Sequence, residues 1–362
     1  MEDDTSSNED NNSSNAESNN SESTEEKPNE TNLIVYSMAT NEPALKFKTS
    51  SVPLSLGIAA DLGKLYLSAT DVLCDDWHVS MYIDSHPKHR IVRLYRQTTK
   101  KIDTNEEEDN TQEDSIGHTT KTKTQIESEV LPDIYESVRD RVREFIKESY
   151  VYRNADNVLV IQGHGNPQIV SQFTSIGVLS DGSLDNLKIV SLAKDISMLK
   201  NNTDKKPFKI IALDSCCLAL LENVVALEEV CDYVVAFQDE APWNGFVNAY
   251  LLEILCSNDS WPSKLKRVLQ IYAQDAESQD KPSSISLFAT EHSKELLELV
   301  RAIRPMSPNP SIRDLWSDVF RKVPSHAQTR FRNLFNRVLL AHEIPSNAPR
   351  RKESRHGMSI LV

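Results

Sequence analysis

The chain has 362 residues and a formal net charge of -14 at pH 7, which is long enough for one large domain or two small ones. The acidic balance argues against a nucleic-acid partner, because phosphate binding is driven by cationic surface. No segment approaches the ~20 continuous apolar residues of a membrane span. The first residues also lack the cationic and apolar parts of a secretory signal peptide. We therefore expect a cytoplasmic protein that enters no membrane.

The cysteines favour the same compartment. They are five, irregularly spaced: Cys74, Cys216, Cys217, Cys231 and Cys256. A secreted disulfide scaffold typically carries an even number of cysteines at regular spacings. We expect reduced thiols and no disulfide framework.

Charge is distributed unevenly along the chain. Residues 1–31 are mostly Asp, Glu, Asn and Ser, so they cannot bury enough apolar surface to offset ordering entropy and are predicted to form a disordered acidic tail. A second acidic tract, 103–127, is interpreted as a mobile surface insertion. The arginine-rich end predicts a helical region over 291–345 and a basic tail over 346–362. Whether the charged ends are solvated surfaces or bind a partner stays open.

Hydrophobic periodicity predicts the central elements in chain order. Alternating apolar and polar residues predict an edge hairpin formed by residues 77–84 and 89–98. Short apolar runs predict buried strands at 32–39, 157–162, 209–213 and 232–237. Helical patterns are found at 131–150, 187–199 and 218–230, and again at 247–256, 261–277, 290–303, 312–323 and 327–342. Strands that alternate with helices predict a parallel sheet with right-handed crossovers.

Two of the buried strands end in residues suited to nucleophilic catalysis. The run VLVIQGHGN places His164 between Gly163 and Gly165, and KIIALDSCC places Cys216 beside Cys217. Ligands of parallel sheets bind beyond the carboxyl ends of the strands. A His and a Cys at two such ends can form a thiolate–imidazole pair.

Each residue type has a role in that chemistry. The thiolate must be stabilised by its surroundings, and Cys216 directly precedes a helical pattern whose positive end would do so. His164 would act as general base and then as acid. The backbone N–H groups of Gly165 and Cys216 are candidate donors to a tetrahedral oxyanion.

Other interpretations of these residues stay open at this point. A histidine after a strand can be a hydrogen-bonded structural residue, and a cysteine can fill a core. A zinc site from His164, Cys216, Cys217 and Cys231 lacks the usual spacing of zinc ligands. Spacing alone also leaves the choice between Cys216 and Cys217 undecided.

Several segments together resemble the clostripain-like cysteine peptidases, which share a caspase-like fold with caspases, gingipains, legumains and separases. LDSCCLA is similar to the family segment D-A-C-L-M-A, VLVIQGHG to its strand ending in His-Gly, and DYVVAFQDEAPWNG to its next strand. The resemblance covers about residues 32–255. It implies a three-layer α/β sandwich with a mostly parallel sheet, a peptidase domain over 32–290, and extra helices after it.

The resemblance also implies residue roles. It places Cys216 at the nucleophile position, His164 at the general-base position, and Asp214 at the base of the S1 pocket, where the family's acid selects Arg or Lys at P1. A buried carboxylate rewards a cationic side chain and rejects a neutral one. The alternative for Asp214 is a carboxylate that caps a strand end or a helix.

We therefore expect an endopeptidase that cuts protein or peptide substrates after basic residues, with no metal and no organic cofactor. The alternative is a catalytically inactive scaffold that binds proteins. It is favoured by Gly163, which stands where the family usually has Asp. Relatives are often activated by cleavage at a basic residue, and the candidate sites are Lys121, Lys123, Lys205 and Lys206.

Overall fold

The structure, a computed structural model, describes most of the regular elements of the chain. The described residues are 30–38, 77–85, 88–99, 121–131, 137–151, 155–163, 165–166, 175–176, 187–200, 205–239, 241, 248–276, 284–303, 312–345 and 356–361.

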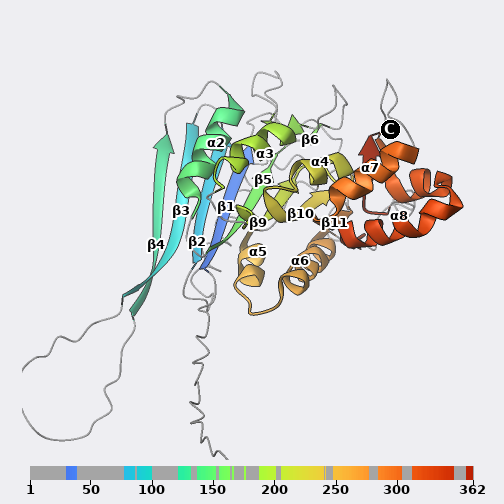
Figure 1. The fold of residues 1–362 in the computed structure, drawn as a ribbon. Coiled ribbons are helices and arrows are strands. Elements are labelled where there is room, and N and C mark those ends of the chain that lie inside the picture. Colours follow the sequence, from blue (N-terminus) through green and yellow to red (C-terminus); the bar gives the residue numbers. More distant parts are fainter. Residues whose placement is uncertain are drawn as a thin grey trace, which may run out of the picture.

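A nine-stranded sheet in the order β13-β11-β10-β9-β5-β1-β2-β3-β4 forms the centre (Figure 1). Its strands are β1 (Glu30–Met38), β2 (Trp77–Ser85), β3 (Lys88–Thr99), β4 (Lys121–Leu131), β5 (Ala155–Gln162), β9 (Phe208–Asp214), β10 (Cys231–Phe237), β11 (Ile285–Ala289) and β13 (Leu339–Glu343). The five strands β2, β1, β5, β9 and β10 run parallel. Antiparallel strands complete the sheet at both sides, β3 and β4 on one and β11 and β13 on the other.

The parallel strands are apolar because both of their faces are covered. Every residue of β5 is buried, which is typical of strands between two helical layers. Successive residues point to opposite faces, so Val158 and Val160 enter one core while Leu159 and Ile161 enter the other.

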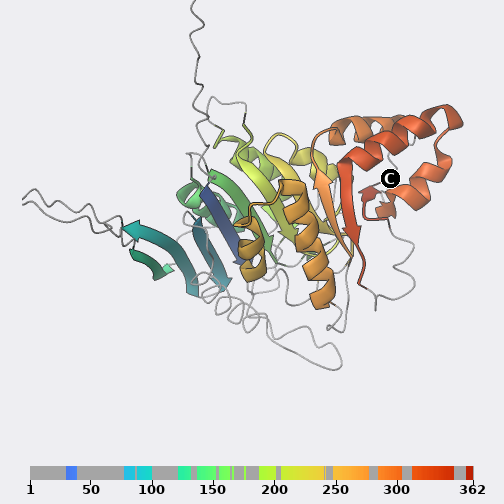
Figure 2. The same cartoon turned by 90° about the horizontal axis from the view of Figure 1, so that it is seen from below.

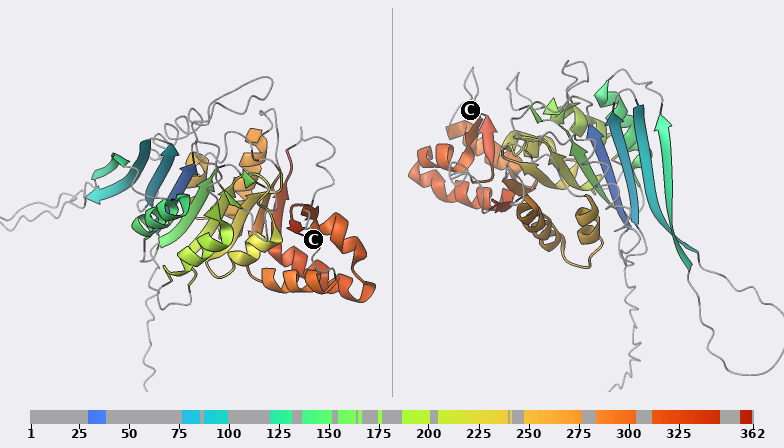
Figure 3. Two further views of the ribbon diagram at one scale, coloured as in Figure 1. Left: turned by 90° about the horizontal axis from the view of Figure 1, so that it is seen from above. Right: turned by 180° about the vertical axis from the view of Figure 1, so that it is seen from behind.

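Helices cover the two faces in separate groups. One face carries α2 (Val138–Ser149), α3 (Ile189–Ser197) and α4 (Leu221–Ala226), and their core extends to α7 (Ser293–Ile303) and α8 (Ser325–Val338). The other face carries α5 (Asn248–Leu255) and α6 (Trp261–Ala276). Figures 2 and 3 show the sheet between these layers, with α7 and α8 beyond its β11–β13 side. Within the described residues, no helix is both long enough and apolar enough to cross a membrane.

Two small sheets lie beside the main one. The first joins β6 (Gly165–Asn166), β7 (Ser175–Ile176) and β8 (Leu187–Lys188). The second pairs β12 (Ile312–Asp314) with β14 (Ser359–Leu361), and a π-helical turn (Leu315–Val319) and a 3₁₀ turn (Phe320–Lys322) follow β12.

The predicted fold class is confirmed. The apolar runs are strands β1, β5, β9 and β10, and β1 is central between β5 and β2. The predicted hairpin is β2 and β3, which pair antiparallel. Its predicted place at the edge of the sheet is wrong, because β4 pairs with β3 and forms that edge. The predicted alternation of strands and helices is also confirmed, because α2 precedes β5, α3 precedes β9 and α4 precedes β10.

Several boundaries of the predicted elements are wrong. The helix predicted over 131–150 begins at Val138, and the helix predicted over 218–230 spans only Leu221–Ala226. Residues 30–31 belong to β1 instead of the acidic tail and pair with β5. Residues 121–127 belong to β4 instead of a loop, because β3 offers this segment a hydrogen-bonding partner. The predicted helix over 327–342 ends at Val338, and the chain continues as strand β13 on β11. The predicted basic tail ends in β14.

Strand β11 was not predicted and falls between the helices predicted over 261–277 and 290–303. The helix predicted over 312–323 is wrong, because these residues form β12 and the π-helical and 3₁₀ turns that follow it. Residues 1–29, 103–120 and 346–355 lie outside the described residues.

Candidate active site

The carboxyl ends of β5 and β9 lie side by side, and the two predicted catalytic residues follow these strand ends in the sequence. The last register pair of these strands is Gln162 with Asp214. His164 and Cys216 each follow two residues later in the chain. His164 itself lies outside the described residues.

Hydrogen bonds fix the backbone just beyond these two strand ends. Gly163 N–H donates to the carbonyl of Asp214 at 3.1 Å. In return the Ser215 hydroxyl donates to the carbonyl of Gly163 at 2.8 Å. Ser215 is fully buried. The strand that leads to His164 and the strand that leads to Cys216 are therefore tied to each other before either residue is reached.

Residues 215–220, here called the nucleophile loop, also join the end of β10. Cys217 N–H donates to the carbonyl of Asp239 at 2.7 Å. Cys217 has a φ of 59°, a left-handed conformation that costs a non-glycine residue about 1–2 kcal/mol.

The Cys216 sulfur has a defined backbone donor. Ala241 N–H donates to Cys216 Sγ at 3.2 Å. Hydrogen bonds to an ionised acceptor are about twice as strong as neutral ones, so this contact favours the thiolate over the thiol. Sequence patterns gave no indication of Ala241, because a backbone N–H is available at every non-proline residue.

The expected help from a helix terminus is wrong. Helix α4 begins at Leu221, five residues after Cys216, and its N-cap Leu220 is extended at φ -103° and ψ 138°. The reason is tertiary, since Ala219 N–H pairs with the carbonyl of Phe237 at 2.8 Å as a strand would. Asp214 is likewise not the N-cap of α4, a position that belongs to Leu220.

Two buried carboxylates flank the nucleophile loop. Asp214 ends β9 and is 2% exposed, and Asp239 follows β10 and is 3% exposed. The Ser284 hydroxyl donates to Asp239 Oδ2 at 3.2 Å. Sequence reasoning selected Asp214 and missed Asp239, although it too directly follows a buried strand. The site is therefore more acidic than predicted.

The end of β5 is supported from its other side. Gln162 is buried, and the Ser37 hydroxyl of β1 donates to its Oε1 at 2.9 Å. Strand β6 begins at Gly165 and pairs with β7, with Gly165 opposite Ile176. Glycine carries no side chain, so its backbone permits close approach by another atom.

The alternative zinc site does not form. Cys231 begins β10 and pairs with Phe208, the first residue of β9, whereas Cys216 follows the last residue of β9. Seven strand residues separate these ends, about 20 Å at the usual rise per residue. Burial raises the pKa of the Cys231 thiol well above its ordinary value, as expected for a core cysteine. Among the described residues no group of His, Cys, Asp and Glu is arranged to hold a metal.

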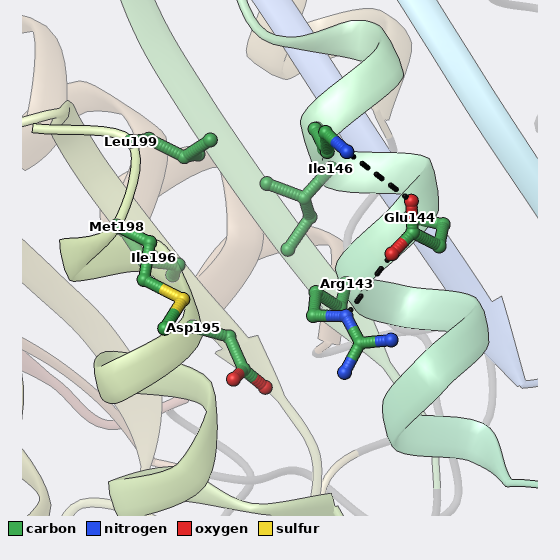
Figure 4. A pocket seen from close by; sticks show the side chains of 8 residues that line it. Arg143, Glu144, Ile146, Asp195, Ile196, Met198 and Leu199 are labelled. Carbon is green, nitrogen blue, oxygen red and sulfur yellow. Dashed lines mark hydrogen bonds and ion pairs between the residues drawn. The ribbon is translucent and has the colours of Figure 1, made fainter.

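A cavity of about 280 Å³ lies elsewhere, between α2 and α3. Figure 4 shows Arg143 and Glu144 on α2 facing Asp195 and Met198 at the end of α3. The end of α2 is next to the start of β1, because Asn32 Nδ2 donates to the carbonyl of Ser149 at 2.9 Å. The cavity therefore lies toward the amino ends of the parallel strands, whereas the nucleophile loop lies at their carboxyl ends. It is not part of the candidate active site.

Two of the candidate processing lysines are held in regular structure, and a third is anchored by its side chain. Lys121 and Lys123 lie in β4 and pair with β3. Lys206 Nζ donates to the carbonyl of Cys231 at 3.1 Å and to Thr290 Oγ1 at 2.9 Å. Lys205 is exposed, so among the four it best meets the requirement for cleavage.

The parallel sheet between helical layers, with a cysteine on the loop after β9, is the arrangement expected of a cysteine peptidase of caspase-like fold. A sequence profile of the Clostripain family matches residues 119–311, just over half of the chain. The chain belongs to the clostripain family.

Solved structures agree with this assignment at the level of the fold. A secreted C11 cysteine protease from Bacteroides thetaiotaomicron in complex with an irreversible peptide inhibitor has a TM-score of 0.65 at 14% identity, over 92% of this chain and 93% of that one. An inactive zymogen C11 protease from Parabacteroides distasonis has a TM-score of 0.61 at 14% identity, over 92% of each chain. No curated protein is similar enough in sequence to count as a match.

Proposed function

We propose that the protein is an endopeptidase that cuts peptide bonds after Arg or Lys, with Cys216 as nucleophile and His164 as general base. The observation that carries this proposal is the hydrogen bond from Ala241 N–H to Cys216 Sγ, on a loop that follows the strand paired with β5. Cys217 donates its own N–H to the carbonyl of Asp239.

The chemistry follows from these positions. Cys216 Sγ attacks the carbonyl carbon of the scissile bond, and the resulting oxyanion is held by the N–H groups of Gly165 and Cys216. His164 carries the thiol proton to the departing amine as the C–N bond breaks. A water molecule, deprotonated by His164, then attacks the thioacyl carbon and releases the carboxylic acid and the Cys216 thiol. The atoms balance with water as the one co-reactant.

The preference for a basic P1 residue rests on the buried carboxylates. Asp214 and Asp239 are shielded from water at the ends of β9 and β10, and a charge shielded from water attracts an opposite charge more strongly than an exposed one. Asp214 is our proposed S1 acid because it precedes the nucleophile on the same strand end.

The test compares two peptide substrates that differ only in charge. Purified full-length protein is incubated with a peptide that carries Arg at P1 and with the same peptide that carries citrulline, the neutral isostere. We expect turnover of the Arg peptide, strong preference over citrulline, and loss of turnover in Cys216→Ala and His164→Ala but not in Cys217→Ala. Asp214→Asn should remove the preference.

Two outcomes would overturn parts of this proposal. Equal rates for Arg and citrulline would remove the S1 role of Asp214. The absence of turnover together with the absence of thiol labelling by a P1-Arg electrophile would favour the inactive binding scaffold.

A further inference from the structure

The end of the chain is a packed part of the structure. Residues 356–361, here called the C-terminal segment, include Met358 at 0% and Ile360 at 1% exposure. Both side chains enter the same core as α4, α7 and α8. Figure 1 places this end of the chain above α7, on the side of the sheet where the parallel strands end.

The C-terminal segment bonds directly to the nucleophile loop. Ser359 N–H donates to the carbonyl of Ala219 at 2.9 Å, and Leu220 and Ser359 form a parallel β-bridge. On its other side Ala219 donates to the carbonyl of Phe237. The second half of the nucleophile loop is thus hydrogen-bonded to the end of β10 on one side and to β14 on the other.

Gln238 connects the same segment to the loop by a second route. The carbonyls of its two neighbours, Phe237 and Asp239, accept the N–H groups of Ala219 and Cys217. Gln238 therefore lies between the two backbone contacts that hold the loop.

The Gln238 side chain is 4% exposed and is held by the end of the chain. Its Nε2 donates to Ser359 Oγ and to Asp314 Oδ2, each at 3.0 Å. Its Oε1 accepts from Gly357 N–H at 2.9 Å. Both amide hydrogens and the amide oxygen are satisfied, so one rotamer is strongly favoured.

We propose that the C-terminal segment, acting directly on Ala219 and indirectly through Gln238, holds the nucleophile loop in the conformation that presents Cys216 to the substrate. Gln238 and Ser359 are positioning residues and do not touch the substrate. This inference rests on the proposed function, because it assigns these residues a role in the same reaction.

A nucleophile must be placed closely to react. A displacement of about 1 Å at a reacting group can cost roughly 100-fold in rate. Cys217 in the loop has a left-handed backbone conformation. An extended or helical conformation of the loop would relieve the strain at this residue. Contacts with β10 and β14 oppose that relaxation, and β14 lies outside the segment 119–311 that matches the family profile.

Ser359 offers a matched pair of variants in the full-length chain. Ser359→Ala removes the hydroxyl and keeps the N–H that Ala219 accepts. Ser359→Pro removes both, and proline is compatible with extended backbone. We expect Ser359→Pro to lower kcat roughly 10- to 100-fold with little change in KM, and Ser359→Ala to stay within about threefold of wild type, since it loses only one neutral contact.

Gln238→Met provides an independent variant if Ser359→Pro does not fold. It keeps the length of the side chain and removes its three hydrogen bonds, and we expect the same fall in kcat. The second readout is the pH profile of Cys216 alkylation by iodoacetamide, with the modified cysteine identified by mass spectrometry. We expect the profile to move to higher pH in both variants, because a displaced Cys216 loses the Ala241 N–H.

The outcomes separate this inference from the proposed function. Wild-type turnover that is lost in Cys216→Ala supports the proposed function alone. If wild type shows no turnover, the proposed function fails, and the alkylation profiles still decide whether the C-terminal segment positions Cys216. Folded Ser359→Pro and Gln238→Met proteins with lower melting temperatures but wild-type kcat and alkylation profiles would overturn the inference, because the segment would then be structural only.

Discussion

Two buried polar networks join elements at the end of the sheet where the parallel strands end. One network is built on an ion pair, and the other is centred on the neutral amide of Gln238. Under α2, Arg141 Nε donates to Asp84 Oδ2 at 3.0 Å, and the Tyr36 hydroxyl donates to the same oxygen at 2.5 Å. This network joins β1, β2 and α2. Beside β10, the amide of Gln238 joins Asp314 and the C-terminal segment.

The two networks are similarly buried, but they connect different parts of the molecule. The Arg141–Asp84 network attaches a helix to the sheet at a place that the nucleophile loop does not touch. The Gln238 network attaches the end of the chain to the residues that contact the loop. Breaking the first should cost stability alone, whereas breaking the second should cost stability and activity together.

The largest expected effect is on stability, in Arg141→Met. Arg141 and Asp84 are each 8% exposed at their side chains, and removal of one partner of a buried ion pair typically costs about 3–5 kcal/mol. Chemical denaturation of wild type and variant would measure the loss. The kcat per folded molecule should stay unchanged, and a large fall in kcat would contradict the separation of the two networks.

Gly357→Ala should disturb the other network. Gly357 has a φ of 85°, and an added Cβ would lie 2.8 Å from His342 Cγ. We expect a loss of about 1–3 kcal/mol from strain and a fall in kcat, measured by denaturation and peptide turnover. Ser359→Ala is the control, since it changes the same segment without strain.

The two networks should also fail at opposite ends of the pH scale. Burial, and then the Asp84 carboxylate, raises the pKa of Tyr36 well above its ordinary value. A raised pKa gives stability that is present below the unfolded value of about 10 and is lost as pH rises through the folded value.

The pKa of Asp314 is shifted in the opposite direction. Burial alone would raise its pKa, but hydrogen bonds from the N–H groups of Ser317 and His356 and from Gln238 outweigh it and hold the pKa below the ordinary value. Its contribution is present above the unfolded value of about 3.9 and is lost as pH falls through the folded value. Denaturation of Asp314→Asn against wild type should show a difference that shrinks in acid and not in alkali. A difference independent of pH would contradict this sign.

The smallest effect is expected for Arg139→Ala. Arg139 makes a bidentate ion pair with Asp195 across α2 and α3 at 2.8 Å, and its side chain is 42% exposed. The Asp195 side chain is 8% exposed, but the guanidinium stays in water, so we expect the pair to contribute on the order of 1 kcal/mol. Denaturation and turnover should both remain close to wild type, so this variant serves as a control for mutation at a site remote from the nucleophile loop. A loss comparable with that of Arg141→Met would show that exposure does not rank these ion pairs.

The sequence was sufficient for the parallel strands and insufficient for the edges. Strands β1, β5 and β9 are buried on both faces, so their apolar runs are continuous and unambiguous. Strand β13 follows α8 without a break and is half-buried throughout, so its composition continues the helical pattern. Residues 339–343 become a strand because they pair with the edge of β11.

The candidate site divides in the same way. Cys216 and Asp214 were predicted because side-chain chemistry is written in the residue type. Ala241 and Ser359 act through backbone N–H groups, which no composition or spacing reveals. The apolar residues of HGMSILV inside an arginine-rich end were the available indication that the last residues pack into the core.

The most direct measurement for the whole account is the site of covalent labelling by a P1-Arg chloromethyl ketone on the intact protein. Mass spectrometry of the digested adduct should place the label on Cys216 in wild type and in Cys217→Ala, and should find none in Cys216→Ala. A label on Cys217, or no label on either cysteine, would contradict the assignment of Cys216 as the nucleophile.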